Sequence, residues 1–289
     1  TILTHMVRST VTLDDKYTEP SGRIYLNGLQ ALIRIPMMQH LIDKRANLNT
    51  ATFVSGYRGS PLGGVDIEFG RAKKFLPDHN ITFHPGLNED LAATSVWGTQ
   101  QLALNKKARY DGVTGIWYGK GPGVDRSMDV LKHANAAGTA LHGGVLALAG
   151  DDHACKSSTF PHQSEQAFVH AMMPVLHPAG IQDALELGLH GIAMSRYSGC
   201  WVGMKCITDN VDSSASVSVD SARVQIRMPT HFEMPSEGLH IRWPDQAMDA
   251  EKRLHKYKIN AALAFANEDQ INRITMDSST PRFGIISTG

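Results

Sequence analysis

The chain has 289 residues, of which 42% are hydrophobic and 19% charged, and its 28 basic and 28 acidic residues give a formal net charge of zero. This length can bury a sizeable core, and the balanced charge argues against a protein that binds nucleic acid or a membrane surface by electrostatic attraction. The three cysteines have no CxxC spacing, the N-terminus has no apolar core of a signal peptide, and no apolar run could span a bilayer, so we expect a cytoplasmic protein.

Short apolar runs alternate with segments of helical periodicity over the first two thirds of the chain. Strands are predicted at 50–57, 81–86, 112–121, 143–152, 173–178 and 200–209. Helices are predicted at 27–46, 65–76, 89–104, 124–138, 157–171 and 181–196. Strands that are apolar throughout and alternate with helices are typical of a doubly wound α/β fold, with a mostly parallel sheet and helices on both faces.

After about residue 210 the alternation fades. VDSSASVSVD (211–220) has the pattern of an exposed segment, residues 228–245 are interrupted by prolines, and residues 249–270 form one predicted helix. The sequence therefore predicts an N-terminal extension or a tag remnant at 1–13, the sheet domain at 14–208, a connection with one helix at 209–280, and the start of a further domain at 281–289. Because residue 1 is not Met and the chain ends on an apolar run followed by Gly, we expect an N-terminal fragment of a longer protein.

Four polar, glycine-rich stretches directly follow predicted strands: SGYRGSPLGG (55–64), HPGLNED (84–90), YGKGPGVDR (118–126) and GDDHACKSS (150–158). The carboxyl ends of parallel strands share one edge of a sheet, and open α/β sheets bind ligands at that edge. The sequence therefore predicts a site there.

Each stretch also has a simpler interpretation. Residues 55–64 could be a turn that starts a helix. Residues 118–126 contain neither GxGxxG nor GxxxxGK[ST], which disfavours an independent nucleotide site. Residues 150–158, with His162 and Glu165 beyond them, have spacings unlike a compact metal centre, so we predict a hydrogen-bonded wall and no metal.

Glu89 lies in GLNEDLAATSVWGTQ, where Asn88 is a natural N-cap. Glu89 and Asp90 would then occupy the first helical turn, where the helix dipole favours negative charge. Helix capping accounts for all three residues, but a carboxylate at a ligand-binding edge could also serve chemistry. The residues alone leave both interpretations open.

The stretches GYRGSP, NEDLAA and GDDHACKSSTFPHQSEQ occur in this order, with DDKYT before them and SRYSGCWVGMKC after them. Over residues 14–245 the chain resembles the pyrimidine-binding domain of the thiamine-diphosphate-dependent 2-oxoacid:ferredoxin oxidoreductases, and most of all the long single-chain indolepyruvate type. The resemblance implies an enzyme that oxidatively decarboxylates an aryl 2-oxo acid, indolepyruvate, to an acyl-CoA. Coenzyme A and ferredoxin would be its partners.

The resemblance also implies roles for single residues. Glu89 matches the glutamate that binds N1′ of the aminopyrimidine and activates the cofactor, which makes it the catalytic residue of this domain. Ser60, with Gly59 before it, occupies the position of a cofactor-contacting Ser or Thr. Weaker candidates for binding the carboxylate of the 2-oxo acid are Arg58, which stands where many relatives have Pro, together with Lys120 and Arg126.

Thiamine enzymes bind the diphosphate and Mg²⁺ through a GDG…N motif, and this sequence has none. Its three cysteines also cannot hold an iron–sulfur cluster. We therefore expect half of a cofactor site, completed by the remaining domains in a homodimer, with Mg²⁺ and the iron–sulfur clusters bound there and the isolated chain inactive. The alternative is a non-catalytic doubly wound module that binds a nucleotide or assembles subunits.

Overall fold

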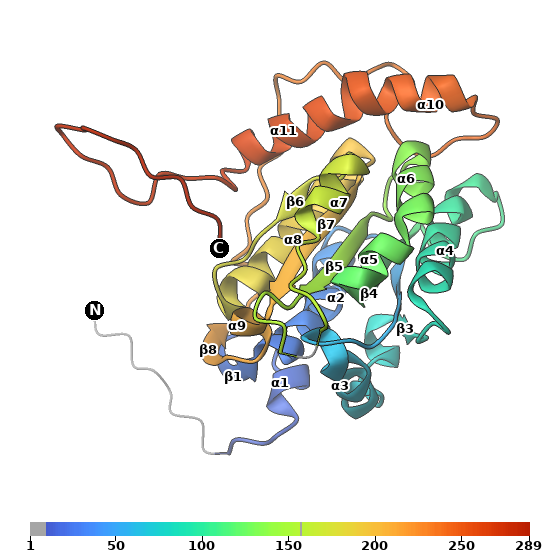
Figure 1. Ribbon diagram of the computed structural model, residues 1–289. Coiled ribbons are helices and arrows are strands. Elements are labelled where there is room, and N and C mark those ends of the chain that lie inside the picture. Colours follow the sequence, from blue (N-terminus) through green and yellow to red (C-terminus); the bar gives the residue numbers. More distant parts are fainter. Residues whose placement is uncertain (1–9, 157) are drawn as a thin grey trace.

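A computed structural model describes residues 10–156 and 158–289. Its centre is a six-stranded sheet of order β3-β2-β4-β5-β7-β6 in which every neighbouring pair is parallel. The sheet confirms the predicted fold class (Figure 1). Its strands are β2 (Thr50–Gly56), β3 (Ile81–Phe83), β4 (Gly112–Lys120), β5 (Val145–Asp151), β6 (Val175–Leu176) and β7 (Trp201–Ile207).

Helices connect the strands and cover both faces of the sheet. They are α1 (Asp15–Thr18), α2 (Gly28–Arg45), α3 (Val65–Ala72), α4 (Glu89–Gln100), α5 (Gly121–Arg126), α6 (Met128–Ala137), α7 (Glu165–His170), α8 (Ile181–Ser198), α9 (Thr208–Val211), α10 (Ala247–Arg253) and α11 (Ile259–Glu268). Short turns of other helical types are η1 (Leu62–Gly64), η2 (Pro77–His79), η3 (Gln101–Leu104) and η4 (Leu254–Lys258).

Alternate side chains of each strand enter two separate cores. On β4, Ile116 and Tyr118 pack with residues of α2, α3 and α8, whereas Trp117 packs with residues of α4, α6 and α7. Successive side chains of a strand point to opposite faces, so a strand covered on both sides is apolar throughout. This is why the strands could be predicted from continuous apolar runs.

A two-stranded antiparallel ribbon lies beside the main sheet. Its strands are β1 (Arg23–Asn27) and β8 (Ser214–Ser218), with Ile24 opposite Val217. Both of these side chains are buried. Residues 211–220 are thus partly buried, although the serine-rich pattern predicts exposure, and no strand was predicted at β1. Pairing between segments so far apart depends on tertiary structure and has no local signal.

Several predicted helices differ in extent from the observed ones. The helix predicted at 65–76 ends at Ala72, and the one predicted at 89–104 changes at Gln101 to the short turn η3. The prediction of a helix at 157–171 is wrong for residues 158–164, because α7 begins only at Glu165; Ser157 lies outside the described residues. Pro161 disfavours helical geometry at Phe160, and the Ser164 backbone N–H is bound by the Asp151 side chain. The predicted helix 124–138 begins earlier, at Gly121, and breaks at Ser127 into α5 and α6.

The helix predicted at 249–270 is present as α10, η4 and α11 in succession and lies next to α6 in Figure 1. Lys258 is fully buried, and its ammonium donates to the carbonyl oxygens of Asn135 at 3.0 Å and Ala136 at 2.8 Å. Burial lowers the pKa of Lys258 to about 8. These bonds fasten the C-terminal helix to the last turn of α6. Residues 281–289 belong to neither sheet.

None of the helices in the described part of the chain is long and apolar enough to cross a membrane. Cys155, Cys200 and Cys206 are all free thiols.

His79 makes the stability of this fold dependent on pH. It packs against His40 of α2, with ring centroids 5.5 Å apart, and its Nδ1 is buried without a partner among the described residues. Burial, with smaller contributions from His40 and Arg34, lowers the pKa of His79 to about 4. Between that value and the pKa of about 6.5 in the unfolded chain, the unfolded state binds more protons, so stability is lost as the pH falls through this window.

The wild-type chain loses unfolding free energy as the pH falls from 7 to 4.5. We expect this loss to be smaller in the His79→Phe variant, by up to about 3 kcal/mol. Urea unfolding of both proteins at pH 7 and at pH 4.5 measures the change in unfolding free energy, with the wild-type chain as the reference. Burial also lowers the pKa values of His40, His177 and His240, but these groups are retained in both proteins. Parallel pH dependences in the two proteins would show that His79 does not contribute.

Candidate functional site

The strand order reverses between β2 and β4. The helix after β2 is α3, whose residues belong to the same core as those of α2 and α8. The helices after β4 are α5 and α6, whose residues belong to the other core. The chain therefore leaves these two adjacent strands on opposite faces, and doubly wound sheets bind ligands at the carboxyl edge beside such a switch point.

All four glycine-rich stretches gather at this edge. The Gly86 N–H, after β3, donates to the Gly56 carbonyl at the end of β2 at 2.8 Å. A Cβ on Gly59, after β2, would lie 2.6 Å from Lys120 Cδ at the end of β4, and a Cβ on Gly150, in β5, would lie 3.1 Å from Pro61 Cδ. The predicted clustering is confirmed, and the glycines are what permit such close approach.

Glu89 begins α4 at this edge, and the predicted cap is present. The Asn88 side chain accepts from the Leu91 N–H at 2.9 Å, and the Trp117 indole N–H donates to the Glu89 carbonyl oxygen at 2.9 Å. These bonds fix the backbone on both sides of the Glu89 Cα.

The Glu89 side chain lies against glycines of β4 and α5. A Cβ on Gly123 would be 2.5 Å from Glu89 Cγ and 2.8 Å from its Oε1, and a Cβ on Gly119 would be 3.5 Å from the same Cγ. Glu89 is half-buried, and no hydrogen bond or ion pair to its carboxylate is found within residues 10–156 and 158–289. A half-buried acceptor without a protein partner is available to a donor from a ligand.

Of the predicted residues on the other loops, Gly59 and Ser60 are half-buried, and Ser60 precedes Pro61 through a cis peptide bond. Arg58 is exposed, whereas the Lys120 stem lies on Gly59. Neither cation forms an ion pair with another described residue.

The third cation, Arg126, forms an ion pair. Its Nε donates to Asp90 Oδ1 at 3.1 Å, in a pair whose side chains are 54% and 39% exposed. Asp90 therefore points along the surface toward α5 and does not share the position of Glu89.

The last residue of β5 and the residues that follow it form a hydrogen-bonded wall. Asp151 is fully buried and accepts from the Ser164 N–H at 2.9 Å and from the Ser164 hydroxyl at 2.6 Å. Asp152 accepts from the Lys156 N–H at 3.0 Å, and His153 is exposed. The structure brings no three metal-ligating side chains together within the described ranges.

Several neighbours of Glu89 were not predicted from the sequence. They are Trp117, whose indole bonds the Glu89 backbone, and Gly123, which lies against the Glu89 side chain; the contact of His162 with Gly121 at the same edge was not predicted either. The one available signal was the glycine at every second position of GKGPG, a spacing that indicates close approach of other groups to the backbone.

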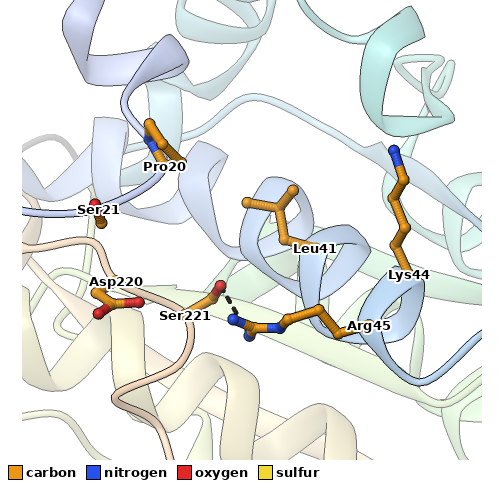
Figure 2. A pocket seen from close by; sticks show the side chains of 7 residues that line it. All are labelled: Pro20, Ser21, Leu41, Lys44, Arg45, Asp220 and Ser221. Carbon is orange, nitrogen blue, oxygen red and sulfur yellow. Dashed lines mark hydrogen bonds between the residues drawn. The ribbon is translucent and has the colours of Figure 1, made fainter.

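Two cavities lie away from this edge. One, of about 420 Å³, is lined by Pro20, Ser21, Leu41, Lys44, Arg45, Asp220 and Ser221, and Figure 2 shows Arg45 donating to the Ser221 hydroxyl. Lys44 and Arg45 end α2, which precedes the start of β2, so this cavity is at the opposite edge of the sheet. The other, of about 540 Å³, lies between α10 and residues 235–246.

No family model matches the chain. Its structure is similar to 2-oxoglutarate:ferredoxin oxidoreductase from Magnetococcus marinus, solved with 2-oxoglutarate, coenzyme A and succinyl-CoA bound, with a TM-score of 0.58 and 14% identity over 86% of this chain and 46% of that one. A thiamine diphosphate-dependent 4-hydroxybenzoylformate decarboxylase from Rhodococcus jostii RHA1 matches with a TM-score of 0.45 and 13% identity, over 66% and 32% of the two chains. The chain therefore shares the α/β fold of the matched part of the 2-oxoglutarate:ferredoxin oxidoreductase.

In sequence, the chain is distantly related to the indolepyruvate oxidoreductase subunit IorA of Methanothermobacter thermautotrophicus. The two are 23% identical over 277 residues, which cover 92% of this chain. The chain spans 39% of the length of that subunit.

Proposed function

We propose that this chain is the N-terminal part of an enzyme that oxidatively decarboxylates an aryl 2-oxo acid, indolepyruvate, to an acyl-CoA, and that it supplies the pyrimidine half of a thiamine diphosphate site. The observation that carries this proposal is the unpaired, half-buried Glu89 carboxylate at the switch point of the sheet. The distant relation to an indolepyruvate oxidoreductase subunit supports the substrate.

The residues at this edge fit an aminopyrimidine. Glu89 offers an acceptor for a proton at N1′, Gly119 and Gly123 place no side chain beside its carboxylate, and Ser60 offers a hydroxyl from the neighbouring loop. When bound, thiamine diphosphate supplies the carbon nucleophile and the electron sink that decarboxylation of a 2-oxo acid requires.

Glu89 acts in this proposal by holding a proton at N1′. A carboxylate suits the task because it accepts one proton from a defined direction once its backbone is fixed, here by Asn88 and Trp117. Asp90 is unsuited, since its carboxylate is bound to Arg126.

Two cations are available for the carboxylate of the 2-oxo acid. Lys120 is held on Gly59 beside Ser60, and Arg58 is exposed next to the same turn. Arg126 is a weaker candidate than these two, because Asp90 already neutralises much of its charge.

Residues 14–208 form the proposed pyrimidine-type domain, residues 209–280 the connection, and residues 281–289 the start of the next domain. Other domains of the longer protein, in a homodimer, would bind the diphosphate with Mg²⁺ and carry the iron–sulfur clusters that pass electrons to ferredoxin.

Calorimetric titration with thiamine diphosphate and Mg²⁺ tests the proposal. We expect binding by the full-length protein and none by residues 1–289 alone, because one half of the site lacks the groups that hold the diphosphate. Tight binding of a plain nucleotide by residues 1–289 would instead favour the non-catalytic module.

A further inference from the structure

Helix α5 forms the wall behind the Glu89 carboxylate, and little within the helix itself stabilises it. It has only six residues, its sequence is GPGVDR, and no side chain caps its N-terminus. Glycine is a poor helix former, and short isolated helices are marginal in water. The position of α5 must therefore be set by contacts with its surroundings.

His162 makes two such contacts. Its Nε2 lies 2.8 Å from Asp125 Oδ2, in the last turn of α5, and its ring packs directly on Gly121, the first residue of the helix, where any Cβ would collide with the imidazole. One side chain thus touches both ends of α5.

On its other side, His162 faces the end of β5. Its Nδ1 lies 3.6 Å from Asp151 Oδ1, beyond hydrogen-bond distance, and is buried without a hydrogen-bond partner among the described residues, whereas Asp151 itself is fully buried and held by Ser164. The His162 side chain is only 20% exposed. The ring is therefore enclosed between α5 and the end of β5.

The second polar contact of α5 is longer, 3.1 Å against 2.8 Å, and both contacts are partly exposed, since the Asp125 side chain of the first is 61% exposed. It is the Arg126–Asp90 pair, and exposed ion pairs of this kind contribute about 0–1 kcal/mol because water screens them. On the inner side of α5, Gly123 lies against the Glu89 side chain. Movement of α5 therefore displaces the Glu89 carboxylate.

We infer that His162 is a positioning residue: it holds α5 against β4 and so fixes the Glu89 carboxylate in the geometry that the cofactor needs. This inference rests on the proposed function, since it assigns to His162 an effect on cofactor binding that is transmitted through Glu89.

The test uses the full-length protein and the dissociation constant of thiamine diphosphate with Mg²⁺, measured by calorimetry. His162→Leu keeps the bulk on Gly121 but removes the bond to Asp125, and we expect it to weaken binding about tenfold. His162→Gln retains an N–H donor near the position of Nε2 and should bind within about threefold of the wild-type protein. Thermal melting of each variant reports the fold.

A double-mutant cycle separates positioning from general stabilisation. In a Glu89→Ala background, His162→Leu should change the dissociation constant by less than about twofold, because the carboxylate that it positions is gone. If the effects of the two substitutions on the dissociation constant multiply, or if His162→Leu binds as the wild type does, His162 has no positioning role. Should His162→Leu fail to fold, Asp125→Leu removes the same bond from the other side and takes its place in the cycle.

The outcomes also distinguish this inference from the proposed function. A wild-type protein that does not bind thiamine diphosphate contradicts the proposed function, and the role of His162 falls with it. A different set of results contradicts only the role of His162. In that case the wild-type protein binds thiamine diphosphate and Glu89→Ala binds it more weakly, but His162→Leu binds it as the wild type does.

Discussion

Replacing Glu89 by Ala or Gln in the full-length protein should lower the turnover of an aryl 2-oxo acid by roughly 10²- to 10⁴-fold, the range that a positioned acid–base group contributes. The carboxylate has no protein partner in the described part of the chain, so its loss leaves no buried group unsatisfied. The fold should persist. The free energy of unfolding should fall by about 0.3–1 kcal/mol, because the negative charge at the start of α4 is missing. Steady-state kinetics with indolepyruvate, coenzyme A and ferredoxin, together with thermal melting, measure both effects.

Asp90→Asn is the matched control for this substitution. It removes one negative charge from the same helical turn, but the Asp90 side chain is directed to Arg126 on the surface. Turnover should stay within about threefold of the wild-type value, as expected for an exposed pair. Near-normal turnover of Glu89→Ala would contradict the assignment of Glu89, and an equal loss in both variants would attribute the effect to helix electrostatics.

Gly123→Ala should impair the enzyme while leaving its stability unchanged or slightly higher. The new methyl group would meet Glu89 Cγ at 2.5 Å and Oε1 at 2.8 Å, so the carboxylate must move. A misplacement of about 1 Å can cost roughly 10²-fold in rate. Alanine is a better helix former than glycine, so we expect the loss of turnover to occur without a lower melting temperature.

Gly98→Ala controls for the effect of adding a methyl group to a helix. Gly98 lies on α4 itself, and a Cβ there would meet no atom within 4 Å. This variant should gain about 0.5–1 kcal/mol of stability and keep its turnover. Steady-state kinetics and urea unfolding of both glycine variants make the comparison, and an active Gly123→Ala enzyme would show that Glu89 tolerates displacement.

Much of the candidate site could be predicted because its signals are local. The Asn88 cap depends on residues three apart, and the glycine-rich stretches follow apolar runs directly in the chain. Parallel strands all place their carboxyl ends at one edge, so the order of segments alone was enough to gather four loops there.

The contacts between these loops could not be predicted, because they join residues far apart in the chain. Nothing near Arg126 indicates that it binds Asp90, and nothing near His162 indicates that it binds Asp125. The helix predicted at 157–171 was wrong at its start for the same reason, since the Asp151 side chain bonds the Ser164 backbone there.

The sequence by itself determined the alternation of strands and helices, the edge at which the glycine-rich loops gather and the place of Glu89 at the start of α4, because each depends on periodicity or capping within a few residues. Only the tertiary structure decided which cations remain unpaired, which helix forms the wall behind Glu89 and which side chain holds that helix. These depend on the strand order, which brings the ends of β2, β3, β4 and β5 together across long stretches of chain.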